Sequence, residues 1–174
     1  EGQRVAETCA AAGVKDAALT EILDGAYLEK GRLKEAIKFY NEILEYRPND
    51  KQVWRVLGEL YTREENYDQA AKCYQAMFSD DPEVSREVIK RLEELLVKLE
   101  GNVFVREILA EIYTRSLKPE LAIAKLLEIS RLDLEKNDEV IAKLRTTLKS
   151  YPGHPQATLA LARDHGAIRQ GDHV

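Results

Sequence analysis

The residues best suited to chemistry in this chain are three histidines near its end, His154, His165 and His173. Imidazole nitrogens bind zinc and act as general acids and bases near neutral pH. His154 and His165 lie eleven residues apart, which is about 16 Å along a helix. Ligands of one metal ion lie about 2 Å from it. The spacing therefore argues against a shared metal site, and neither cysteine is near in sequence.

Adjacent acids are the second group with chemical potential: Glu64-Glu65, Asp80-Asp81 and Glu93-Glu94. Cooperating carboxylates must converge on one substrate, but adjacent positions on a helix point apart, and acids at turns cap helices. The chain has no glycine-rich phosphate loop, serine elbow or zinc-binding helix motif. We therefore predict a non-enzyme with no metal and no cofactor.

The cysteines and the hydropathy pattern indicate a reducing, cytoplasmic environment. Cys9 and Cys73 both stand among apolar helical neighbours, where thiols are usually small core residues. No apolar run approaches the roughly 18 residues of a membrane span, and nothing resembles a signal peptide. We expect no direct membrane insertion. The chain lacks an initiator Met and begins in an expected helix, so we expect a piece of a longer protein, with any anchor or other domain outside it.

Composition favours an all-α protein that does not bind nucleic acid. One-third of the residues are charged, only nine are glycine and five are proline, and Ala, Leu, Glu and Lys dominate, which favours helices. The net charge of −5 argues against duplex nucleic acid, which usually meets a strongly basic face. We expect the partner to be another protein.

The stretch from Val53 to Pro82 predicts a helical hairpin. One apolar stripe contains Trp54, Leu57, Leu60 and Tyr61, and the next contains Ala70, Tyr74 and Met77. Gly58 leaves room for the second helix to come close. The turn at Asn66 is too short for anything but an antiparallel connection.

The same landmarks recur at one spacing. Each of the pairs Tyr27 and Tyr61, Ala36 and Ala70, Tyr40 and Tyr74, and Pro48 and Pro82 is 34 residues apart. This order resembles the tetratricopeptide repeat (TPR) family, whose signature is a Trp, a Leu-Gly pair, a Tyr, then an Ala, an aromatic residue and a closing Pro. The resemblance is specific over residues 17–84 and degenerate over 85–170. It implies a right-handed α-solenoid of antiparallel helix hairpins.

We expect a single array, although its second half can be framed in two ways. The predicted parts are a partial N-terminal helix 4–12, repeats 17–50, 51–84, 85–118 and 119–152, and a closing helix 155–170. In the other frame, Leu109-Ala110, Tyr113 and Ala122 align with Leu57-Gly58, Tyr61 and Ala70, which leaves 85–102 as an extra helix. We prefer the 34-residue count, because the two layers of a solenoid alternate strictly.

The resemblance also implies which residues face a partner. First helices of successive repeats line a concave groove, and the corresponding positions here are Glu21, Leu28, Glu29, Arg55, Glu59, Thr62 and Arg63. One TPR subclass grips a chaperone's C-terminal carboxylate with Lys, Asn and Arg. This chain has Glu21, Gly25 and Val56 at the first of those positions, and Glu107 and Glu111 in the second frame, so it does not resemble a chaperone clamp.

The leading functional prediction is a scaffold or adaptor that binds a peptide or helix of a partner protein in this groove. A structural, self-associating module is the alternative, with a homodimer seam on the wide apolar stripe of Val88, Leu92, Leu95 and Leu99. A regulatory domain of a larger multidomain protein is the third reading.

Overall fold

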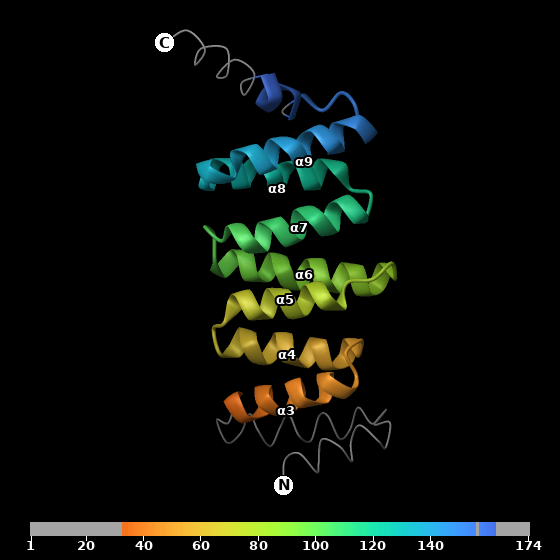
Figure 1. Cartoon of the computed structure of the whole chain (residues 1–174), viewed down its shortest axis with the longest axis vertical. Coiled ribbons are helices and arrows are strands. Elements are labelled where there is room, and N and C mark those ends of the chain that lie inside the picture. The colour runs from red at the N-terminus through yellow and green to blue at the C-terminus, as the bar shows by residue number, and fades with distance from the viewer. Residues whose placement is uncertain (1–32, 156, 163–174) are drawn as a thin grey trace. The chain divides into compact units, whose positions relative to one another are not determined.

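The structure is a computed structural model that describes residues 33–155 and 157–162 (Figure 1). Regular structure in these residues is helical, and they contain no strand, which confirms the all-α class. The chain divides into two compact units, the first ending at Phe78 and the second beginning at Ser79. In each unit the helices pack against their neighbours in chain order, which is the arrangement predicted for a solenoid of hairpins.

The first unit contains three described helices: α3 (Leu33–Tyr46), α4 (Lys51–Arg63) and α5 (Tyr67–Met77). The side chain of Asp50 caps α4 by accepting from the N–H groups of Gln52 and Val53, and Asn66 caps α5 by accepting from Gln69. These caps satisfy backbone donors that a helix start leaves without partners. The hairpin predicted around Asn66 is thus confirmed as α4 and α5.

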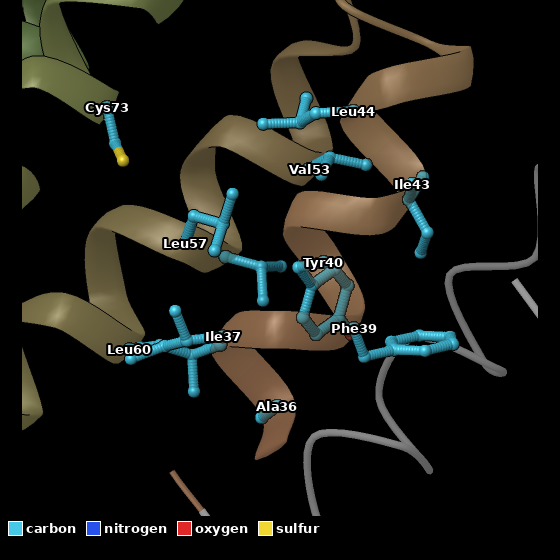
Figure 2. Packing of buried hydrophobic residues seen from close by; sticks show 11 residues of the cluster. Ala36, Ile37, Phe39, Tyr40, Ile43, Leu44, Val53, Leu57, Leu60 and Cys73 are labelled. Atoms are coloured by element: carbon cyan, nitrogen blue, oxygen red, sulfur yellow. The ribbon is translucent and has the colours of Figure 1, made fainter. Parts of the chain in front are cut away.

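One cluster of buried side chains in the first unit comes from α3 and α4, with Cys73 added from α5 (Figure 2). One stripe of α3 is buried: Ala36, Phe39, Tyr40, Ile43 and Leu44. Trp54 and Tyr61 are only partly buried beside this core. The indole N–H of Trp54 donates to the carbonyl of Pro48 at 2.8 Å, so Trp54 ties the start of α4 to the preceding turn.

Helix α5 lies very close to α4 at Gly58. A Cβ at this position would lie 2.4 Å from Cε1 of Tyr74 and 2.8 Å from its Cδ1 and Cζ. The Tyr74 ring is 2% exposed. The close approach predicted from Gly58 is therefore present, and the ring that fills the space comes from the predicted stripe of α5.

The second unit contains α6 (Pro82–Lys98), α7 (Val103–Arg115), α8 (Pro119–Leu132), the short 3-10 helix η1 (Leu134–Lys136) and α9 (Asn137–Ser150). A last helical stretch covers residue 155 and residues 157–162. The part of the predicted closing helix after residue 162 and the predicted helix 4–12 lie outside the described residues.

The turn between α4 and α5 recurs between α7 and α8, 52 residues later. Glu65 and Leu117 both have positive φ, at 61° and 54°. The N–H of the next residue donates across the turn in both hairpins, from Asn66 to Tyr61 and from Lys118 to Tyr113, each at 2.9 Å. The α7–α8 hairpin therefore matches the second frame of the sequence in its local geometry. The predicted boundary between residues 118 and 119 falls at the end of this turn, and the 34-residue array stays a prediction.

Candidate partner-binding surfaces

The described residues predicted to face a partner lie on α4, at positions i, i+4, i+7 and i+8 of one helix face. We call Arg55, Glu59, Thr62 and Arg63 the α4 face. Arg63 is exposed and the other three are half-buried. Glu21, Leu28 and Glu29 lie outside the described residues. The α4 face thus presents two cations, one anion and one hydroxyl.

Hydrogen bonds connect side chains of the α4 face to other residues of the α4–α5 hairpin. The Thr62 hydroxyl donates to the carbonyl of Gly58 at 2.7 Å and lies 3.3 Å from the hydroxyl oxygen of Tyr74. Since the single hydroxyl proton of Thr62 is directed to Gly58, Tyr74 is the donor in the second contact. Nη1 of Arg55 donates to Oε1 of Gln52 at 3.1 Å. Thr62 therefore links α4 to α5. The charged groups of Arg55, Glu59 and Arg63 give the face its mixed charge.

The predicted dimer seam on α6 is mostly inside the protein. Val88 and Leu92 have no exposed surface and Leu95 is 2% exposed, while Leu99 is half-buried. The exposed large apolar residue of this helix is Val97, at 79%. A seam through the first three side chains requires them to leave their present packing, and it stays a prediction.

An ionic network joins α6, α7 and α8. Nζ of Lys125 lies 3.3 Å from Oε1 of Glu93 and 3.6 Å from Oε2 of Glu128. Nε of Arg106 donates to Oε2 of Glu128 at 2.9 Å, and the Tyr113 hydroxyl donates to Oε1 of Glu93 at 3.0 Å. We call Glu93, Arg106, Tyr113, Lys125 and Glu128 the α6–α8 network. Two cations and two anions balance in it.

Burial perturbs two protic side chains. Burial, reinforced by the charge of Glu93 and the hydrogen bond to it, raises the pKa of the Tyr113 hydroxyl far above its usual value. Burial alone raises the pKa of the Cys73 thiol to about 12. Both groups therefore stay protonated at neutral pH, and Cys73 is not activated as a nucleophile, which requires the thiolate.

Residues 27–96 match the model of a family described as "Tetratricopeptide repeat". Over these residues the chain is similar to the tetratricopeptide repeat family. The segment includes all of the α4 face. The match supports a protein–protein interaction scaffold, and the family typically lacks catalytic activity.

Solved structures give a more distant likeness. One is "MamA 41-end from Desulfovibrio magneticus RS-1", 16% identical, with a TM-score of 0.41 and coverage of 91% of this chain and 98% of that chain. Another, "MamA RS-1 ArsTM double mutant", is 16% identical, with a TM-score of 0.41 and coverage of 92% and 98%. No curated protein matches the chain.

Of the three histidines, only His154 lies among the described residues. Among the described residues, no three His, Cys, Asp or Glu side chains are placed to hold a metal ion. Nδ1 of His154 accepts from the N–H of Ala157 at 3.4 Å, so it caps the last described helical stretch. His165 and His173 lie outside the described residues.

In the part of the chain that the structure describes, no helix is long and apolar enough to cross a membrane.

Sequence reasoning missed the α6–α8 network. Glu93 and Lys125 are 32 residues apart, so no local spacing pairs them. In a sequence, each reads as one more charge on the exposed side of an amphipathic helix. A usable signal existed only in the second frame, where Tyr113 takes the place of Tyr61 and so marks a packed position on α7.

Proposed function

We propose that the protein is an interaction scaffold that binds a peptide or helix of a partner protein through the α4 face. One observation carries this proposal: four polar side chains of mixed charge share one face of a helix within the tetratricopeptide segment. Neither face nor segment suggests a reaction. The proposed ligand therefore contacts charged and hydrogen-bonding side chains rather than a reactive group.

The packing beneath the α4 face supports this role. Gly58 and the buried Tyr74 ring fix the distance between α4 and α5, and the Thr62 hydroxyl bonds to both helices. A surface whose backbone is fixed before binding loses less conformational entropy when the partner arrives. Half-exposed charges mainly contribute specificity and association rate, so we expect Arg55 and Arg63 to select acidic side chains of the partner and Glu59 a basic one.

The test uses peptides selected from a displayed library against the full chain. The variant Arg55→Glu with Arg63→Glu reverses two charges on the α4 face. Its control, Lys34→Glu with Lys38→Glu, reverses two exposed charges on α3. Each variant changes the net charge by four, from −5 to −9, so a general electrostatic effect appears equally in both.

We expect the selected peptides to lose at least about tenfold in affinity for the α4 variant, about 1.4 kcal/mol, and to keep their affinity for the α3 variant. Unfolding followed by Trp54 fluorescence checks that the first unit remains folded. Equal affinity for both variants contradicts the proposal, as does failure of the library to yield any binder.

A further inference from the structure

Helix α8 carries a stripe of apolar and charged side chains that is separate from the α4 face. Leu121, Lys125, Glu128 and Leu132 lie at i, i+4, i+7 and i+11, which places them on one side of the helix over about 16 Å. We call these four residues the α8 stripe. Leu121 is 46% exposed and Leu132 is 48% exposed. The stripe therefore has an apolar side chain at each end and charged side chains between them.

The charges between the leucines are ordered by depth. The side chains of Lys125 and Arg106 are only 15% and 12% exposed, whereas those of Glu93 and Glu128 are 39% and 37% exposed. Lys125, which is less exposed than either glutamate, contacts both carboxylates. The anions of the α6–α8 network thus face solvent, and the cations that hold them in place are covered.

We propose that the α8 stripe, together with Glu93 of α6, is a second docking surface, and that its occupant is an amphipathic helix of a partner protein with a Lys or Arg between two apolar residues. The carboxylates of Glu93 and Glu128 have acceptor capacity beyond their bonds to Lys125, Arg106 and Tyr113. A basic side chain placed on the solvent-facing side of these carboxylates adds charge-assisted hydrogen bonds to acceptors that Lys125 already holds in place.

The leucines determine the spacing of the partner's apolar residues. A helix in a groove uses anchors at i, i+3, i+4 and i+7, which span about 10 Å, and Leu121 and Leu132 bracket a longer segment of about 16 Å that accommodates such a set. When such a helix docks, the half-exposed leucines bury apolar surface that was in contact with water, which favours binding. This surface differs from the α4 face in helix, unit and required partner charge, so the two proposals succeed or fail separately.

The probe is a short helical peptide with one lysine between two leucines on its apolar side, labelled for fluorescence anisotropy and titrated with the full chain. Its twin carries glutamate in place of the lysine. We expect the lysine peptide to bind at least about tenfold more tightly than its twin. Amide shifts in an NMR titration should concentrate on α8 and near Glu93.

Three variants locate the peptide. Leu132→Ser removes one apolar anchor, and we expect about a tenfold loss of binding. Leu159→Ser, a change at another exposed leucine (52%), should leave binding unchanged. Glu128→Gln should also weaken binding, and its melting curve shows whether the network still folds. If it unfolds, Leu132→Ser carries the test, because this side chain is half exposed at the end of α8.

Several results overturn the proposal: equal binding of the twin peptides, unchanged binding by Leu132→Ser, or shifts centred elsewhere. A chain mass that doubles with concentration, and that Leu132→Ser returns to one copy, would assign the surface to a second copy and overturn the choice of partner. The variant Arg55→Glu with Arg63→Glu should bind the lysine peptide normally, which separates this result from the test of the α4 face.

Discussion

Replacing Gly58 by alanine tests the packing of the tetratricopeptide segment at a single atom. The new Cβ would lie 2.4 Å from Cε1 of Tyr74 and 2.8 Å from two more ring atoms, whereas carbon atoms in contact lie about 3.5 to 4.0 Å apart. The ring is 2% exposed, and its hydroxyl contacts Thr62. The ring must therefore move, and its hydrogen bond moves with it.

The expected magnitude follows from three opposing effects. Alanine gains about 1 kcal/mol over glycine inside a helix. Overpacking costs about 1 to 3 kcal/mol, and loss of the Tyr74–Thr62 hydrogen bond costs about 1 kcal/mol. We expect Gly58→Ala to destabilise the first unit by about 1 to 3 kcal/mol, and Gly58→Leu to destabilise it further because more atoms meet the ring.

Urea unfolding followed by Trp54 fluorescence is the assay. Trp54 is the only tryptophan of the chain and lies on α4, so its signal reports on the first unit. The control is Gly101→Ala, because no heavy atom lies within 4 Å of a Cβ at that glycine. Circular dichroism of this control should show stability unchanged or slightly raised.

A second-site change makes the test specific to the ring. Tyr74→Leu removes the ring, and we expect Gly58→Ala to cost at least about 1 kcal/mol less in that background, since contacting residues couple. If Gly58→Ala is as stable as the parent or more stable, helix propensity alone governs the position, and α4 and α5 do not meet there.

Three further predictions concern the side chains of Lys125, Cys73 and Tyr113. Lys125→Met should destabilise the second unit by about 1 to 3 kcal/mol, measured by circular dichroism, because Glu93 and Glu128 then face each other without the shared cation; an unchanged melting curve would contradict the role given to Lys125. In a Cys9→Ser background, native Cys73 should resist alkylation at pH 8 and react after denaturation, and rapid labelling of the folded protein would refute its burial. Folding raises the pKa of Cys73 from 9.0 to about 12 and also raises that of Tyr113. The contribution of these two groups to stability should therefore be constant below about pH 8 and should fall as the pH rises from 9.0 towards about 12, since the unfolded chain loses these protons first. Cys73→Ala should flatten this decline.

The local parts of the fold were predictable because their causes are local. Asn66 ends one apolar stripe and begins the next, and the structure places a capped turn there. Gly58 was predicted to allow a close helix approach, and the Tyr74 ring occupies that space. Each inference needed only the helical period and the chemistry of one residue.

Other features depend on contacts or on backbone geometry that the helical period of the sequence does not encode. Trp54 matched the apolar stripe but is only partly buried, because its indole N–H reaches the carbonyl of Pro48. Leu117 occupies a positive-φ position where glycine or asparagine is usual, so this residue itself does not indicate the turn. The pairing of Glu93 with Lys125 depends on how α6 and α8 flank α7, which charge patterns alone do not specify.

The most direct test of the central claim is an NMR titration of the full chain with one peptide selected against it. If the protein is a scaffold that works through the α4 face, the largest amide shifts fall between Arg55 and Arg63 and disappear in the Arg55→Glu, Arg63→Glu variant. Shifts that leave α4 untouched, or that persist unchanged in the variant, would place partner binding on another part of the protein.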